Sequence, residues 1–341
     1  MINNTSLITS QDRVNPKRIA SVDMLRAIAA LSVCLFHFSN GNPNYFPNGF
    51  WLKEVGSIGW AGVQIFFVIS GFIIPYSLFA NNYKYADYKF FLLRRFARIE
   101  PPYFCAIIIC LALNYLSTLS PYFKGEPFKF DFINIALHFG YLNAFFNQNW
   151  INPAFWTLAI EFQFYLLIAA LFPLLVHSKV WIRYLVLSAF LISSLLIKNG
   201  GLIFGFTPYF VLGILIFYNK THLLSTKYCI FLNLLILALI YYNNGIVPCA
   251  FAAFACLSLL FIHHYSNKYL LFIGSISYSI YLIHVPIGGR IINFSMNFVK
   301  GNEGRSMILL LAICVVTVMS YIFYKLIEKP SIKLSKSIRN G

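Results

Sequence analysis

Two side chains suited to acid–base and anion chemistry lie on one apolar stretch, residues 20–39. Arg26 is at its start and His37 is near its end. If the stretch is a helix, eleven residues make about three turns, so both side chains lie within roughly 20° of one face but about 16 Å apart. An ionisable side chain inside an apolar span is costly and is therefore a candidate for function. The pair suits a long anionic ligand that lies along the helix with its reactive end at His37.

Two further ionisable residues lie in other apolar stretches. Glu161 is within 153–176 and His284 is within 269–289. With the topology argued below, both fall at about the depth of His37, in the outer half of the membrane. Buried ionisable groups are expensive unless paired or hydrated, so three at one depth favour a site over simple packing. We predict that all three are catalytic, with His37 as the general base and Glu161 as a partner that orients a histidine.

A basic cluster lies just before two consecutive prolines. Arg94 and Arg98 are four residues apart and would share one helix face. Because guanidinium presents a planar fork of donors to phosphate oxygens, we predict that these two, with Arg26, bind the phosphates of a ligand. The alternative is that the cluster only sets membrane topology. Pro101 and Pro102 favour the first turn of a new helix, which predicts a junction between two helices here.

Smaller polar and aromatic side chains complete the candidates. Ser70 could line a channel for the ligand, and packing of helices through small residues is the alternative explanation for its Ser-Gly pair. Trp156, Tyr165 and Tyr281 are candidates for contact with a sugar, which can stack on an aromatic ring. Anchoring at the membrane interface is the alternative role for tyrosine and tryptophan near the ends of spans.

These residues must be positioned by a membrane-embedded helix bundle. Of the 341 residues, 59% are hydrophobic and only 11% are charged, whereas a soluble domain has about 25% charged residues. We therefore predict an all-α, polytopic transmembrane protein. About ten apolar spans can be placed, near 20–39, 57–80, 101–121, 153–176, 181–197, 201–218, 228–243, 246–262, 269–289 and 306–327.

The doubtful segment is 131–146, and the basic residues decide whether it crosses the membrane. With ten spans, 18 Lys and Arg fall inside and 7 outside, whereas an eleventh span changes the split to 12 and 13. The positive-inside rule favours ten spans with both termini cytoplasmic. The segment is then an outer-face or re-entrant helix. We expect a cytoplasmic tail over 1–18 without a cleaved signal peptide, a membrane domain over 19–330 and a cytoplasmic tail over 331–341.

Charge and cysteine content indicate which partners to expect. The net charge of +16 reflects Lys and Arg in short loops, so we interpret it as topological and expect no nucleic-acid partner. All seven cysteines lie in apolar stretches and none forms a C-x-x-C pair. We interpret them as small core residues, and expect neither a disulfide framework nor a metal site.

Six motifs in order resemble those of the acyltransferase 3 family of integral membrane acyltransferases. They extend from Asp23 to Pro330, nearly the whole chain. The motifs are R-x10-H at Arg26 and His37, FFVISGF at 66–72, R-x3-R with a following proline and tyrosine at 94–103, W-[ST]-L-x-x-E-x-x-F-Y at 156–165, G-x-x-S-Y-x-x-Y-L-x-H at 274–284 and Y-x3-E-x-P at 324–330. Each motif alone is weak, but six in this order are specific.

The resemblance implies transfer of an acyl group, usually acetyl from acetyl-coenzyme A, to a hydroxyl of a carbohydrate or other acceptor. The acceptor is often a cell-surface polysaccharide or its lipid-linked precursor. The expected partners are then acyl-coenzyme A, a carbohydrate and the lipid bilayer of the plasma (inner) membrane, and a homo-oligomer or a glycan-assembly protein would be compatible. Some members carry an appended SGNH hydrolase-type domain. Since the sequence ends at Gly341, we expect none here.

Joined to the depth argument, the resemblance predicts a mechanism. The phosphates of coenzyme A bind near Arg94, Arg98 and Arg26, the pantetheine arm extends between helices, and Ser70 lines its path. His37 then removes the proton from the acceptor hydroxyl, and a covalent acyl-histidine is the alternative. Two other classes stay open, namely a transporter or flippase for a lipid-linked glycan, with the ionisable residues as its polar pathway, and a membrane scaffold. Within the enzyme class, a larger acyl group or a small-molecule acceptor also fits.

Overall fold

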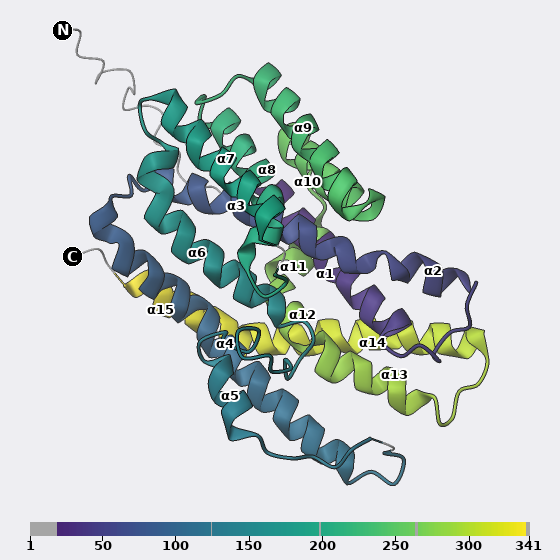
Figure 1. Cartoon of the computed structure of the whole chain (residues 1–341). Coiled ribbons are helices and arrows are strands. Elements are labelled where there is room, and N and C mark those ends of the chain that lie inside the picture. The colour runs from purple at the N-terminus through teal and green to yellow at the C-terminus, as the bar shows by residue number, and fades with distance from the viewer. Residues whose placement is uncertain (1–18, 124, 198, 263–264, 339–341) are drawn as a thin grey trace, which may run out of the picture.

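The computed structural model describes residues 19–123, 125–197, 199–262 and 265–338, and every regular element within them is helical (Figure 1). The longer helices are α1 (Ala20–Asn40), α3 (Gly62–Ala80), α4 (Tyr88–Thr118), α6 (Trp156–Leu175), α7 (Val180–Leu196), α8 (Thr207–Lys220), α9 (Thr226–Asn244), α10 (Ile246–Phe261) and α14 (Asn302–Phe323). The shorter helices are α2 (Trp51–Ser57), α5 (Phe132–His138), α11 (Lys268–Ser275), α12 (Ser277–His284), α13 (Arg290–Ser295) and α15 (Lys329–Ser337). Short 3-10 turns are η1 (Gly59–Ala61), η2 (Tyr85–Asp87) and η3 (Ile203–Phe206), and π-helical turns are η4 (Val285–Gly289) and η5 (Tyr324–Glu328). The predicted all-α fold is confirmed, while the tail predicted over 1–18 lies outside the described residues.

The helices are those of a multi-pass membrane protein. Within the described ranges, seven helical stretches are long and apolar enough to cross a membrane. An eighth crossing would consist of α11 followed by Ser277–Ser295, two parts that meet at a bend of 59°. Two further apolar helices, α7 and α10, are shorter, at 17 and 16 residues. Each of the ten predicted spans thus falls on a helix, and the count of ten is reached only when the bent pair and these two shorter helices are included.

Close helix packing at the centre of the bundle depends on glycine. A Cβ added to Gly71 of α3 would lie 2.1 Å from the carbonyl oxygen of Phe210 in α8, and one added to Gly213 of α8 would lie 2.2 Å from that of Val68. Larger residues would therefore force α3 and α8 apart. Small residues at such crossings let helix backbones approach in a membrane protein, where hydrophobic driving force between helices is weak. The Ser70-Gly71 pair thus contributes to packing, as the alternative explanation predicted.

The predicted helix junction at the two prolines is absent. Helix α4 continues through Pro101 and Pro102 without a break from Tyr88 to Thr118. Because the prolines have no amide hydrogens, the carbonyls of Ala97 and Arg98 receive no ordinary helical hydrogen bond from them. The basic cluster and the apolar second half of α4 nevertheless belong to one continuous helix.

The segment 131–146 does not form a span. It contains only α5, whose seven residues are about 10 Å long. After α5 the chain makes a turn at Tyr141, whose φ is 55°, and the Tyr141 hydroxyl donates a 2.8 Å hydrogen bond to the buried carboxyl of Glu100. Glu100 lies near the middle of α4. The loop after α5 therefore contacts α4 at Glu100, directly before the two prolines.

The chain ends, within the described ranges, in a helix that the sequence analysis had treated as a tail. Helix α15 lies alongside the first half of α4 (Figure 1). The Ser335 hydroxyl donates a 2.7 Å hydrogen bond to the backbone carbonyl of Arg94. Residues 331–337 are thus a docked helical element, and residues 339–341 of the predicted tail lie outside the described residues.

Candidate active site

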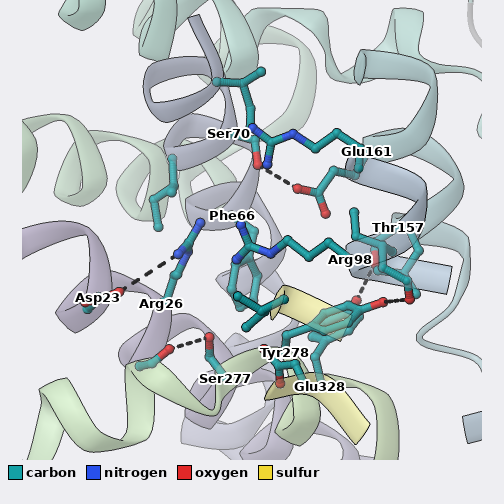
Figure 2. Close-up of a pocket in the computed structure, with 18 of the residues that line it drawn as sticks. Asp23, Arg26, Phe66, Ser70, Arg98, Thr157, Glu161, Ser277, Tyr278 and Glu328 are labelled. Atoms are coloured by element: carbon teal, nitrogen blue, oxygen red, sulfur yellow. Dashed lines mark hydrogen bonds and ion pairs between the residues drawn. The ribbon is translucent and has the colours of Figure 1, made fainter. Parts of the chain in front are cut away.

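A central cavity of about 390 Å³ lies among α1, α3, α4, α6, α11, α12, η5 and α15 (Figure 2). Its charged lining includes four cations, namely Arg26, Arg95, Arg98 and Lys336. Figure 2 shows Arg26 of α1 and Arg98 of α4 reaching into this space from opposite sides. Motifs that are far apart in the sequence therefore contribute to one cavity, because the helices that carry them pack around it.

The guanidinium of Arg26 lies near one carboxylate, that of Asp23. The two groups are 3.9 Å apart, with Asp23 one turn earlier on α1. Asp23 itself is buried, while Arg26 is only partly buried and lines the cavity. An ion pair at this distance is loose, so the guanidinium retains donors for an anionic ligand. The prediction that Arg26 lies at an anion site is compatible with this position.

A chain of polar contacts crosses the cavity from α4 to α3. The guanidinium carbon of Arg95 lies 5.3 Å from the centre of the Tyr165 ring. The Tyr165 hydroxyl donates a 2.5 Å hydrogen bond to Glu161, and the Ser70 hydroxyl donates a 3.0 Å hydrogen bond to the same carboxylate oxygen. Two hydroxyl donors of this kind stabilise an ionised carboxylate. Glu161 therefore orders the cavity wall between α6 and α3.

A third carboxylate, besides those of Asp23 and Glu161, lines the cavity from η5, which follows α14. The π-helical turn η5 places both Tyr324 and Glu328 in the lining. The Ser279 hydroxyl of α12 donates a 2.5 Å hydrogen bond to the Glu328 carboxylate. This bond connects the Y-x3-E-x-P motif at 324–330 with the G-x-x-S-Y-x-x-Y-L-x-H motif at 274–284. Tyr278 directly precedes Ser279 in α12, and its hydroxyl donates a 2.9 Å hydrogen bond to the carbonyl of Ile99 in α4. These two bonds join α12 to η5 and to α4.

One end of the central cavity is closed by an aromatic and hydroxyl cluster. The Tyr281 and Thr157 hydroxyl oxygens are 2.6 Å apart, and the Tyr281 hydroxyl is also 3.1 Å from the carbonyl of Ala154. The ring of Phe66 meets that of Tyr281 edge to face, with centroids 5.6 Å apart. Phe66, Thr157 and Tyr281 all line the cavity, and we call them the closing cluster.

A pair of histidines lies beyond the closing cluster. The rings of His37 and His284 have centroids 5.2 Å apart, and the ring of Tyr281 is 5.8 Å from that of His284. Neither histidine lines the central cavity. Tyr281 is therefore in contact with both the cavity and the histidine pair, and separates them.

The hydrogen bonds of His284 define its tautomer. Its Nδ1 lies 2.8 Å and 3.1 Å from the carbonyl oxygens of Tyr281 and Ile280. A carbonyl only accepts, so Nδ1 carries the hydrogen and Nε2 of the neutral ring has a free lone pair. That Nε2 is buried without a hydrogen-bond partner among the described residues, and the whole side chain is 0% exposed. An unsatisfied buried acceptor beside His37, which is partly buried, requires an explanation.

A second cavity of about 430 Å³ adjoins the first. It is lined by Arg94, Arg95, Arg98 and Lys336, and it shares the last three with the central cavity. Tyr83 and Phe91 supply aromatic surface to it. Arg95, Arg98 and Lys336 therefore lie where the two cavities adjoin, whereas the closing cluster lines only the central cavity.

The structure places the predicted site residues in four different surroundings. Arg26, Ser70, Arg98, Glu161, Tyr165 and Tyr281 line the central cavity, and Arg94 lines only the second cavity. His37 and His284 lie side by side, with ring centroids 5.2 Å apart. Glu161, which we expected to orient a histidine, instead has Ser70 and Tyr165 as hydrogen-bond donors. Trp156 is outside both linings, and its ring packs against Phe206 at 5.4 Å.

Several lining residues were not among the predicted site residues. They are Asp23, Arg95, Thr157, Tyr278, Glu328 and Lys336. Arg95 was passed over because spacing favoured Arg94 with Arg98, although residues three apart are also neighbours on a helix. Tyr278 and Glu328 lie within motifs that had been recognised, so membership of those motifs was the available signal. Nothing in the sequence placed Lys336 near the arginines, because α15 had not been predicted as a helix.

Comparison with known proteins identifies the family. The family of acyltransferase domains known as acyltransferase 3 matches residues 19–325. The O-acetyltransferase OatA of Staphylococcus aureus (strain NCTC 8325 / PS 47) is 28% identical over 93% of this chain and 57% of its own length. The peptidoglycan O-acetyltransferase OatA of Listeria monocytogenes is 29% identical over 50% of this chain and 26% of its own length. A putative acetyltransferase, ORF330 of Acidianus two-tailed virus, is 24% identical over 81% of this chain and 84% of its own length.

The match to the family covers most of the chain, whereas the match to the bacterial relatives covers only part of those proteins. The chain spans 57% of the length of the Staphylococcus aureus protein. No solved structure gives a significant match. The family match includes Arg26, His37, both arginines of the basic cluster, Glu161 and His284, and ends just before Glu328. On the extent of that match, the chain belongs to the acyltransferase 3 family.

Proposed function

We propose that this protein is a membrane O-acetyltransferase that transfers acetyl from acetyl-coenzyme A to a hydroxyl of a cell-wall or cell-surface carbohydrate. The observation that carries the proposal is the position of Tyr281. It closes a cation-lined cavity on one side and contacts His284 of the histidine pair on the other. A donor bound by its phosphates at the cationic end would thus direct its acyl end toward two histidines.

The donor assignment rests on shape and charge. Two adjoining cavities of about 390 and 430 Å³ give a long path rather than a compact pocket. Arginine forks suit phosphate oxygens at the end of this path where Arg95 and Arg98 lie, and the polar chain of Ser70, Glu161 and Tyr165 offers partners for the amides of a pantetheine arm. The basic residues at this end also favour the cytoplasmic side, where coenzyme A is made available.

The acceptor assignment rests on the relatives. Their names state O-acetyltransferase activity and, for the Listeria monocytogenes protein, peptidoglycan as the substrate. Transfer to such a carbohydrate would take place at the outer side of the plasma membrane, with the hydroxyl approaching His37. A multi-pass bundle with the donor on one side and the acceptor on the other satisfies this requirement.

The chemistry assigns different roles to the two histidines. His37 takes the proton from the acceptor hydroxyl, whose oxygen attacks the thioester carbonyl carbon. The carbon–sulfur bond then breaks, and the departing thiolate receives that proton from His37. Two imidazoles joined head to head by one N–H···N bond have centroids about 5 Å apart, close to the 5.2 Å observed. A small ring rotation would therefore let Nε2 of His284 accept from His37 and hold its other nitrogen toward the hydroxyl, which makes His284 a positioning residue.

Tyr281 must move for the donor to reach the histidines. Its hydroxyl contacts and the edge-to-face packing on Phe66 hold it across the path. Each hydroxyl contact of this kind contributes only about 1 kcal/mol net. Binding of a ligand in the cavity can therefore offset the free-energy cost of rotating the Tyr281 ring. The closed position would limit hydrolysis of the thioester by water when no acceptor is bound.

The test uses membranes that contain the protein, radiolabelled acetyl-coenzyme A and cell-wall glycan. We expect label to appear in base-labile ester linkage on the glycan, and this labelling to disappear with His37→Ala. His177→Ala is the matched control, because His177 is also partly buried but follows α6 and lines neither cavity. Failure of the wild-type protein to transfer acetyl from acetyl-coenzyme A would refute the proposed donor.

A further inference from the structure

Helix α15 provides part of the proposed donor site, although it lies beyond residue 325, where the family match ends. Glu328 in η5 and Ile332 and Lys336 in α15 all line the central cavity. Lys336 also lines the second cavity, together with Ser335. The helix therefore extends along both cavities and brings a cation to the place where they join.

The position of Lys336 is fixed by packing against the basic cluster. The hydrogen bond from Ser335 to the backbone of Arg94 joins α15 to α4 at the residue next to Lys336. Lys336 is consequently held on the same cavity as Arg95 and Arg98. Lys333, one turn earlier on α15, is exposed and lines neither cavity. The two lysines thus differ in position but share a helix and a residue type.

The charge in the second cavity exceeds what one diphosphate would balance. Arg94, Arg95, Arg98 and Lys336 face it with one carboxylate, that of Asp87. The Asp87 carboxylate already accepts a 2.9 Å hydrogen bond from the backbone amide of Lys84. Coenzyme A carries, besides its diphosphate, a phosphate monoester with a charge of about −1.5 to −2 at neutral pH. The charge of four cations and one carboxylate therefore matches the diphosphate and the phosphate monoester together better than the diphosphate alone.

We propose that Lys336 of α15 binds the 3′-phosphate of the donor and makes the site selective for coenzyme A over its 3′-dephosphorylated form. The proposal rests on the proposed function, because it takes coenzyme A as the donor. Tyr83 and Phe91, which line the same cavity, offer aromatic surface to the adenine ring that carries this phosphate. Arg95 and Arg98, which line both cavities, are then placed for the diphosphate.

Binding of coenzyme A and dephospho-coenzyme A to the whole protein in phosphatidylcholine nanodiscs tests the proposal. Since the Lys336 side chain is exposed, solvent screens its charge, and we expect Lys336→Ala to weaken coenzyme A binding about three- to tenfold. Dephospho-coenzyme A should lose less than about twofold, because it lacks the group that Lys336 contacts. Lys336→Arg should keep most of the affinity, and Lys333→Ala should leave both ligands unaffected.

Three results would overturn the assignment. Equal weakening of both ligands by Lys336→Ala would place Lys336 at the diphosphate. If Lys336→Ala and Lys333→Ala weakened coenzyme A binding equally, the cause would be the total charge of α15 and not a specific contact of Lys336. Abolition of the Lys336→Ala difference by phosphatidylglycerol in the nanodiscs would assign the lysine to lipid headgroups instead.

The proposal and the proposed function fail in different ways. Acetyl transfer by the wild-type protein, with no change in ligand selectivity in Lys336→Ala, would overturn the role of α15 and leave the enzyme assignment standing. Selective coenzyme A binding that depends on Lys336, without any acetyl transfer, would support the role of α15 and contradict the proposed reaction.

Discussion

The histidine pair supports the sharpest prediction, which is a double-mutant cycle. Loss of a general base typically lowers the rate by about 10² to 10⁴, equivalent to about 2.7–5.5 kcal/mol, so His37→Gln should lose transfer by that factor. A residue that only orients a catalytic group costs less, about 10- to 100-fold by analogy with groups that orient metal ligands. His284→Gln should therefore lose transfer by about that smaller factor. Because His284 acts through His37, the double variant should lose no more than His37→Gln alone.

The structure also predicts what these variants leave unchanged. Neither histidine lines the central cavity, so the dissociation constant of coenzyme A should be unaffected in both. His37 is partly buried and its replacement should be tolerated, whereas His284 is 0% exposed and its Nδ1 bonds to its own helix, so His284→Gln should lower the melting temperature more. The assay is single-turnover transfer of radiolabelled acetyl, with thermal stability measured in parallel. Strictly additive losses would refute a shared proton path, and retention of most activity by His37→Gln would move the role of base to His284.

Three further predictions follow from the cavities, the helix packing and the loop charges. Arg98→Ala, which affects both cavities, should raise the KM for acetyl-coenzyme A by about tenfold or more. Arg98→Lys should raise this KM less but still measurably, because lysine lacks the planar fork of donors. An equal rise in the KM for the acceptor would contradict a role of Arg98 in donor binding. Gly71→Ala should destabilise the fold by more than about 1–3 kcal/mol, measured as loss of monodisperse protein on heating, while Gly200→Ala, with nothing within 4 Å of the added Cβ, should not. In a background without native cysteines, Lys333→Cys should react with an impermeant thiol reagent only from the cytoplasmic side and Lys53→Cys only from outside, and the reverse result would invert the topology.

The sequence by itself determined the class of protein and six of the residues that line the central cavity. Low charge and long apolar runs require helices in a bilayer, since only helices and closed barrels satisfy their own backbone there. The motifs at Arg26, Arg98, Glu161 and Tyr281 were recognisable without coordinates, and all four side chains line the central cavity. The eleven-residue spacing correctly separated Arg26 from the histidine, because the rise per residue of a helix is fixed.

Only the tertiary structure decided which of these groups meet. The expected depth in the membrane fixes how far along its helix each of His37, Glu161 and His284 lies. It does not fix the direction in which each side chain points, which depends on the rotation of the helix about its axis. That rotation brings the two histidines together and gives Glu161 the hydroxyls of Ser70 and Tyr165 as partners. The same limit applied to the basic cluster, where spacing favoured Arg94 and packing placed Arg95 in the central cavity.

The contribution of α15 was the least predictable feature. The sequence after Pro330 is polar and short, and a nine-residue helix is not stable by itself. It forms in contact with α4, where Ser335 bonds to the backbone of Arg94, and this contact brings Lys336 to the arginines more than 230 residues earlier in the chain. Local sequence fixes which side chains are present, but a cavity is a property of helices packed together, so its lining is decided only when all of them are in place.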